Sequence, residues 1–185
     1  MRRTVFALFF CLAISFSAQA KAENPDFVET MEQARQGNAV AQYNLGLMYA
    51  EGKGVDQDGI EAVRWYTLAA EQGYLPAINN LGMTYDYGSL GIPEDNGKAI
   101  YWYRRAAEAG VGKAQFNLAR MYAQGEGVPR NLVLAYMWVS LAARLGEEVS
   151  ANRAWLAERL TRDEVARADD LSLKCASQGY KDCGA

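Results

Sequence analysis

The sequence predicts an all-α protein, a solenoid built from three helix-turn-helix repeats. Three segments that open at Ala41, Ala77 and Ala114 share one order of leucine, tyrosine, glycine, tryptophan and paired alanines, and such self-similarity is typical of repeat proteins. Apolar residues in each segment recur three and four positions apart, which is the spacing of one helix face. No segment alternates as a strand would. Because neither helix of a repeat can bury its apolar face alone, about three repeats must stack to form a core.

Each repeat is expected to contain two helices, which in the first copy run near Val40–Glu51 and Gly59–Gln72. The aligned tryptophans Trp65, Trp102 and Trp138 lie on the apolar face of the second helix of each copy. We therefore expect them to pack in the core rather than to form an aromatic cage for a ligand.

The segment Gly52-Lys53-Gly54 after the first helix resembles a loop that binds phosphate. In the third copy, however, Glu126 takes the place of Lys53, and a carboxylate would repel a phosphate. The lysine is also not followed by the Ser or Thr that begins the helix of a P-loop. We therefore expect the glycines to end the first helices in a left-handed turn, which glycine adopts at little cost.

Non-repeating segments at both ends are expected to cap the solenoid. The expected organisation is a signal peptide at 1–20, an N-terminal capping helix within 21–38, three repeats over 39–147 (about 41–76, 77–113 and 114–147), and C-terminal capping helices within 148–185. Within the caps, helices are expected near Pro25–Gln36 and Glu148–Leu160. The segment Thr161-Arg162-Asp163-Glu164 has the pattern of a capping box that begins the last helix.

The first residues have the pattern of a secretory signal peptide. Arg2 and Arg3 precede the apolar run Thr4–Ala18, and Ala18-Gln19-Ala20 is a small-x-small cleavage pattern. The alternative is an uncleaved anchor, but the apolar run is shorter than the ~20 residues that a membrane-spanning helix needs. We therefore expect an exported protein with no stable membrane insertion after cleavage.

Charge and composition exclude several classes of partner and chemistry. Removal of residues 1–20 would take away Arg2 and Arg3 but no acidic residue, changing the net charge from −3 to −5, so nucleic acid and anionic membranes are not expected partners. The absence of histidine excludes Ser-His-Asp and Cys-His nucleophilic systems. The segment Asp56-Gln57-Asp58 could be considered a calcium site, but it lacks the further oxygen ligands that such a site needs. We expect no catalytic residue, no cofactor and no metal.

Two cysteines, Cys175 and Cys183, would remain after cleavage. An even number of cysteines in an exported chain favours one disulfide, which here would close a small loop in the tail. On the chain-entropy model such a loop stabilises the folded state by about 2–3 kcal/mol. The alternative is two free thiols.

Three motifs in a fixed order resemble a known family: Ala-x-x-x-Leu-Gly-x-x-Tyr, then Gly-x-Gly-Val, then Ala-x-x-Trp-Tyr-x-x-Ala-Ala-x-x-Gly. This order is similar to that of the Sel-one-like repeat (SLR) family, relatives of the tetratricopeptide repeats, from Val40 to about Glu147. The third copy departs from the pattern at Ala119, which replaces the glycine, and at Val139, which replaces the tyrosine. The resemblance implies a right-handed α-solenoid that acts as a non-enzymatic adaptor or regulator. In exported bacterial members it implies binding of another protein in the periplasm or cell envelope.

Two functions of other classes stay open. A cysteine-rich branch of the family resembles β-lactamases and penicillin-binding hydrolases, although the repeats here contain no cysteine and the Ser-x-x-Lys motif is absent. The other alternative is a purely structural component of the envelope. The sequence does not name the partner, and an open-ended solenoid of three repeats is also compatible with a homodimer.

The resemblance also implies where a protein partner would bind, because the first helix of each repeat lines the concave side in relatives of this architecture. The expected groove consists of Asn44, Leu47, Glu51, Asn80, Met83, Tyr87, Asn117, Arg120 and Gln124. The asparagine that recurs in all three copies has two explanations, namely bonding to the backbone of an extended partner or bonding to neighbouring backbone between repeats. Alanine variants at Met83, Tyr87 and Arg120 are expected to lose partner capture but to keep their melting temperature.

Overall fold

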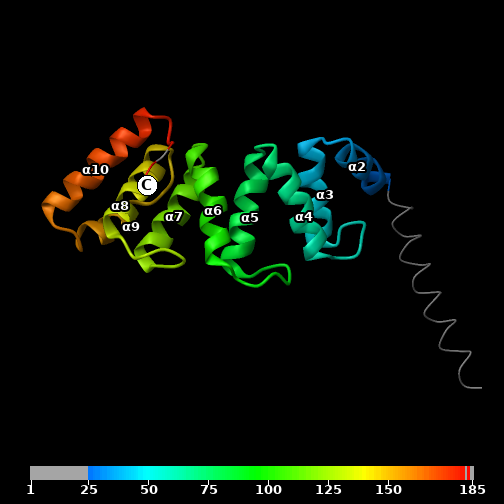
Figure 1. Ribbon diagram of the computed structural model, residues 1–185, viewed down its shortest axis with the longest axis horizontal. Coiled ribbons are helices and arrows are strands. Elements are labelled where there is room, and N and C mark those ends of the chain that lie inside the picture. The colour runs from blue at the N-terminus through cyan, green and yellow to red at the C-terminus, as the bar shows by residue number, and fades with distance from the viewer. Residues whose placement is uncertain (1–24, 182, 184–185) are drawn as a thin grey trace, which may run out of the picture. The chain divides into compact units, whose positions relative to one another are not determined.

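The computed structural model describes residues 25–181 and 183, and the expected signal peptide lies outside this range. All regular structure in the described residues is helical (Figure 1). The helices are α2 Pro25–Arg35, α3 Ala39–Glu51, α4 Gly59–Glu71, α5 Leu75–Tyr87, α6 Asn96–Glu108, α7 Gly112–Gln124, α8 Leu132–Arg144, α9 Ser150–Ala157 and α10 Arg162–Ser177. The first three helices agree with the predicted ranges to within one residue at each end.

The described residues form two compact units, and the division falls inside α5. The first unit holds the residues up to 77 together with the loop segment 90–92. In this unit α3 packs against both α2 and α4. Phe27 of α2 meets Tyr49 of α3 edge-on, with ring centroids 5.9 Å apart, and Leu45 is fully buried. The capping helix α2 thus covers the apolar stripe that α3 would otherwise expose.

The second unit holds residues 78–89 and the chain from 93 onward. Here α6 packs on α7 and α7 on α8, while α8 also contacts the two capping helices α9 and α10 (Figure 1). Trp138 of α8 is fully buried, and Trp102 of α6 is 8% exposed. Trp65 is likewise buried in the first unit, so the prediction that the aligned tryptophans are core residues is confirmed.

The two helices of a repeat approach closely where a glycine faces a tyrosine ring. A Cβ atom at Gly46 would lie 2.6 Å from the ring of Tyr66, and one at Gly82 would lie 2.5 Å from the ring of Tyr103. Both tyrosines are buried. In the first two repeats the helix pair therefore depends on a position without a side chain.

The helix ends follow the local sequence. Asp58, Asp95 and Asn131 precede the second helices of the three repeats, and each side chain accepts a hydrogen bond from backbone N–H groups of the first turn. Gly52 ends α3 with φ 69° and Gly125 ends α7 with φ 80°, in the left-handed region that favours glycine. The prediction that the glycine loops are helix ends is confirmed.

A loop touches the start of a helix at equivalent positions in the two units. In the first unit a Cβ at Gly59, the first residue of α4, would lie 1.8 Å from the carbonyl oxygen of Leu90. In the second unit a Cβ at Gly127 would lie 2.8 Å from the Cβ of Asn96, the first residue of α6. The two helix positions and the two loop positions are each 37 residues apart. Glycine thus stands on the helix side of the first contact and on the loop side of the second.

The C-terminal cap differs from the prediction in one helix. The expected helix near 148–160 is shorter, because α9 runs only from Ser150 to Ala157. Thr161 has an extended backbone and forms the predicted capping box with Glu164 at the start of α10, so the chain must leave the helical conformation before it reaches this residue. The capping box itself is confirmed.

Candidate functional site

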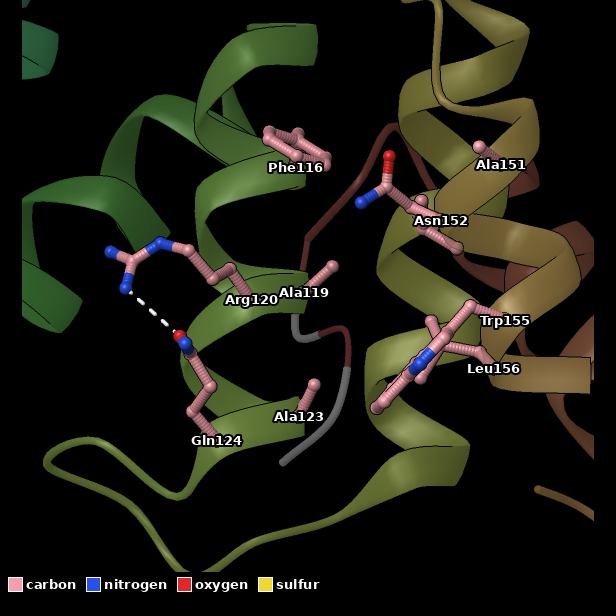
Figure 2. A pocket seen from close by; sticks show the side chains of 10 residues that line it. Phe116, Ala119, Arg120, Ala123, Gln124, Ala151, Asn152, Trp155 and Leu156 are labelled. Atoms are coloured by element: carbon pink, nitrogen blue, oxygen red, sulfur yellow. Dashed lines mark hydrogen bonds between the residues drawn. The ribbon is translucent and has the colours of Figure 1, made fainter.

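The second unit contains a pocket of about 480 Å³ between α7 and α9. Figure 2 shows its two main walls, with Phe116, Ala119, Arg120, Ala123 and Gln124 along α7 and Ala151, Asn152, Trp155 and Leu156 on α9. The lining is mostly apolar, and its polar side-chain groups are one guanidinium, two amides and the indole N–H of Trp155. Pockets of this size and character are typical of sites that bind a ligand or an inserted side chain.

The pocket coincides with the two positions at which the third repeat departs from the others. In the first two repeats a tyrosine ring, that of Tyr66 or Tyr103, lies against the glycine of the facing helix. The third repeat has Ala119 and Val139 at the equivalent positions, and both residues line the pocket. Because valine lacks the ring that fills this place in the other repeats, the exchange leaves room beside α7.

Trp155 is the largest apolar side chain in the pocket, and it is 44% exposed. The guanidinium carbon of Arg159 lies 3.9 Å from the centre of its ring system, within the range of a cation–π contact. Arg159 also donates a hydrogen bond to the Trp155 carbonyl at 2.8 Å. The arginine restrains the indole ring while leaving much of it accessible, as is typical of tryptophans that anchor protein interfaces.

Arg120 joins the pocket to a buried ion-pair network. Its guanidinium bridges the carboxylates of Asp86 in α5 and Glu126 in the loop after α7, and it donates to Gln124 Oε1 at 3.0 Å. The Asp86 side chain is 3% exposed, and it also accepts a hydrogen bond from the Tyr103 hydroxyl at 3.1 Å. A buried carboxylate is costly unless it is paired, so Arg120 supports the fold as well as lining the pocket.

The network shifts the pKa of two of its members. Burial raises the pKa of Tyr103, and the charge and hydrogen bond of Asp86 raise it further. Burial lowers the pKa of Arg120, but the hydrogen bond and charge of Asp86, together with the charge of Glu126, outweigh burial and leave this pKa raised. Tyr103 therefore stays neutral and Arg120 stays cationic near neutral pH, so neither group exchanges a proton there.

Three predicted groove residues lie close together here, and two of them, Arg120 and Gln124, line the pocket. The Arg120 guanidinium lies 5.9 Å from the ring centroid of Tyr87, and Arg120 also bonds Gln124 as described above. Tyr87 is 59% exposed, and Met83 on the same helix is also exposed. The structure thus places an exposed aromatic and an exposed aliphatic side chain of α5 in the same unit as the α7–α9 pocket.

The predicted residues of the first copy also lie together, in the first unit. Asn44, Leu47 and Glu51 line a depression of about 260 Å³ on α3. Asp26 of α2 and Lys53 of the following loop contribute charged groups to the same depression. This surface is therefore far more polar than the α7–α9 pocket.

The recurring asparagine has a different environment in each copy. Asn44 is exposed, whereas Asn80 and Asn117 are half-buried and do not line the α7–α9 pocket. Asn80 already has an interaction partner within the protein. Binding of a partner and bonding between repeats both stay predictions for this position.

One expectation about Arg120 conflicts with the structure. Alanine at this position would leave Asp86 buried without its cation, so the melting temperature should fall rather than stay unchanged. Sequence reasoning overlooked Asp86, although the aligned positions of the other copies hold Ala50 and Ala123. A charge at a position otherwise occupied by alanine was the signal. Trp155 was overlooked as a site residue because it lies in a cap that does not repeat.

Cys175 of α10 and Cys183 of the tail are bonded to each other in the structure, with Cα atoms 5.4 Å apart. This separation is usual for a disulfide. Both side chains are buried, so the pair ties the tail to α10. Formation of the bond in the exported protein stays a prediction.

The described part of the chain contains no group of three or more His, Cys, Asp or Glu residues placed to hold a metal ion. Among the described helices, none combines the length and the apolar character that crossing a bilayer requires. What the α7–α9 pocket itself offers is apolar contact area bordered by side-chain amides, which suits noncovalent recognition.

The model of one protein family, described as Sel1 repeat, matches residues 39–74, 75–111 and 112–147, which is more than half of the chain. The chain belongs to the Sel1 repeat family. The prediction of an all-α solenoid with three SLR repeats is thereby confirmed. Sel1 repeats generally mediate protein–protein interactions, and they serve as interaction scaffolds.

This Sel1 repeat protein is similar to two solved structures and one curated protein. The Sel1 repeat protein from Oxalobacter formigenes is 38% identical with a TM-score of 0.62, over 70% of this chain and 97% of that one. The protective antigen c5321, present in uropathogenic Escherichia coli strains and displaying an SLR fold, is 27% identical with a TM-score of 0.53, over 82% of this chain and 41% of that one. The Sel1-like repeat-containing protein L21 of Acanthamoeba polyphaga mimivirus is 44% identical over 54 residues, 29% of this chain, which spans only 10% of L21.

Proposed function

We propose that this Sel1 repeat protein is an exported, non-enzymatic scaffold that binds another protein in the bacterial periplasm or cell envelope. Its family supports the binding role, since Sel1 repeats generally mediate protein–protein interactions. The charged, apolar and small-x-small order of residues 1–20 supports export. The two solved structures described above come from bacterial proteins.

The observation that carries the proposal is the apolar pocket between α7 and α9 with the half-exposed Trp155 in its wall. A partner would insert an apolar side chain between Phe116 and Trp155. Its backbone would bond the amides of Gln124 and Asn152, which border the apolar area. Tyr87 and Met83 would extend the contact along α5, because both are exposed.

The mechanism is reversible recognition by a surface that exists before the partner arrives. Arg120 is held by Asp86 and Glu126, and Trp155 is restrained by Arg159, so little side-chain freedom is lost on binding. Pre-organisation of this kind raises affinity by reducing the entropy cost of association. In such interfaces a few central anchors dominate, each costing ~1–3 kcal/mol when truncated.

Capture experiments with matched variants test the proposal. Trp155→Ala should lose cross-linking to the periplasmic protein that the wild type captures, while keeping its helical circular dichroism. The control is Leu173→Ala, which removes a side chain that is 53% exposed on α10 and does not line the pocket. Equal capture by both variants would contradict a role for the α7–α9 pocket.

Two further measurements separate the proposal from its alternatives. Turnover of nitrocefin by the purified protein would favour the hydrolase, since β-lactamase chemistry opens this substrate. Light scattering of the purified chain distinguishes a monomer from a homodimer. A dimer that Trp155→Ala dissociates would mean that the pocket binds a second copy rather than another protein.

A further inference from the structure

A second cleft of the same unit lies between α8 and α10 and encloses about 650 Å³. Its apolar surface comes from both helices, including Val133 and Met137 of α8 and Leu171 of α10. The paired Cys175 and Cys183 form part of its wall. The cleft shares no lining residue with the α7–α9 pocket, so what it binds does not depend on the proposed scaffold function.

The charged side chains in the described lining of this cleft all have the same sign. Arg167 and Lys174 line it from α10, and no acidic residue is among its described lining. The two positions are seven residues apart and so lie on one face of the helix, about two turns from each other. Neither side chain forms a salt bridge or hydrogen bond with another described residue.

Two cations that pair with no carboxylate of the described residues therefore lie beside the apolar surface of this cleft. Elsewhere in the same unit Arg120 and Arg153 pair with carboxylates. The two exposed cations attract an anion, while the apolar side chains beside them favour burial of an alkyl group. The chemistry that complements this cleft is therefore an anion attached to an apolar group.

We propose that the α8–α10 cleft binds an aliphatic carboxylate. Its carboxylate accepts hydrogen bonds from the Arg167 guanidinium, which can present two parallel N–H groups, and Lys174 adds a second positive charge. The alkyl chain lies on Val133, Met137 and Leu171, and its burial there supplies the hydrophobic part of the affinity. The cleft volume is within the range of small-molecule sites.

Calorimetric titration of the purified exported chain tests the proposal with three probes. Decanoate should bind, whereas decyltrimethylammonium, with the same alkyl chain and the opposite charge, should bind at least about tenfold more weakly, a difference of about 1.4 kcal/mol. Acetate should not bind measurably, because it lacks the alkyl chain. No binding of decanoate, or equal binding of the two long-chain probes, overturns the proposal.

Variants assign the binding to this cleft. Arg167→Gln/Lys174→Gln should weaken decanoate binding at least about tenfold, and it should fold normally because both side chains are exposed. Arg162→Gln is the matched control, since Arg162 is an exposed arginine of α10 that does not line the cleft. If the double variant binds decanoate as tightly as Arg162→Gln does, the carboxylate is held elsewhere and the proposal fails.

Discussion

Replacing Arg120 with methionine should destabilise the second unit through Asp86. The change keeps most of the aliphatic side chain but removes the cation that pairs with a carboxylate whose side chain is 3% exposed. Breaking a buried ion pair by removing one partner costs ~3–5 kcal/mol. Arg120 is itself 25% exposed, and Asp86 keeps its hydrogen bond from Tyr103, so we expect the lower end, about 3 kcal/mol. For a chain of this size that corresponds to a fall in melting temperature of about 6–12 °C.

Thermal unfolding followed by far-UV circular dichroism measures the effect. The double variant Arg120→Met/Asp86→Asn should recover most of the loss, because an amide at position 86 still accepts the Tyr103 hydrogen bond and carries no buried charge. The control is Arg64→Met, whose pair with Glu61 is exposed, with 62% and 32% of the two side chains accessible. Such surface pairs contribute about 0–1 kcal/mol. If Arg120→Met melts no lower than Arg64→Met, the buried pair does not stabilise the fold as argued.

Three further outcomes are expected. Gly59→Ala should lower the unfolding free energy, measured by denaturant unfolding, by about 1–3 kcal/mol through overpacking. The control is Gly97→Ala, which should be neutral or stabilising because its Cβ would meet only an Asp side-chain oxygen at 3.4 Å. Burial raises the pKa of Tyr103 in the folded state. The stability that its neutral hydroxyl contributes is therefore complete below the unfolded pKa of about 10 and is lost as pH rises through the folded pKa. As pH rises above ~10, the unfolding free energy of Tyr103→Phe should therefore fall less than that of the wild type. Equal slopes of unfolding free energy against pH for the two proteins would refute this. Mass spectrometry of the unreduced exported chain should show Cys175 and Cys183 without alkylatable thiols, and full alkylation would show that the bond does not form.

The repeat helices could be predicted from sequence because their signals are local and occur three times. Apolar spacing located α3 and α4 to within one residue, and a glycine marked the end of the first helix in each repeat. The last cap was harder, because α9 occurs once and has no side-chain hydrogen bond at its N-cap. Its C-terminal end depends on the extended backbone of Thr161, and the sequence pattern alone did not show how many residues the turn before it requires.

The site could be predicted only in part, for a physical reason. Tyr87, Arg120 and Gln124 could be named as candidates because they lie off the packing faces that periodicity makes evident, and their role in binding a partner stays a prediction. Asp86 was overlooked because its partner is 34 residues away, and pairing across two repeats leaves no local pattern. The pocket itself arises from Val139, where a smaller residue replaces a tyrosine. A sequence alignment shows such a replacement but not whether neighbouring side chains move in to fill the space.

In the two loop-to-helix contacts glycine lies once on the helix side and once on the loop side. The contacts therefore fit together only when the repeats follow one another in their present order. A recombination event that deleted the second repeat would bring Gly127 opposite Gly59, and the contact would become a void. Duplication of the second repeat would bring Leu90 opposite Asn96, and two side chains would compete for space that now holds one. Each loop-to-helix contact therefore fits only the repeat that now follows it. We expect the number of repeats to change in evolution only when a compensating substitution at the contact accompanies the gain or loss of a repeat.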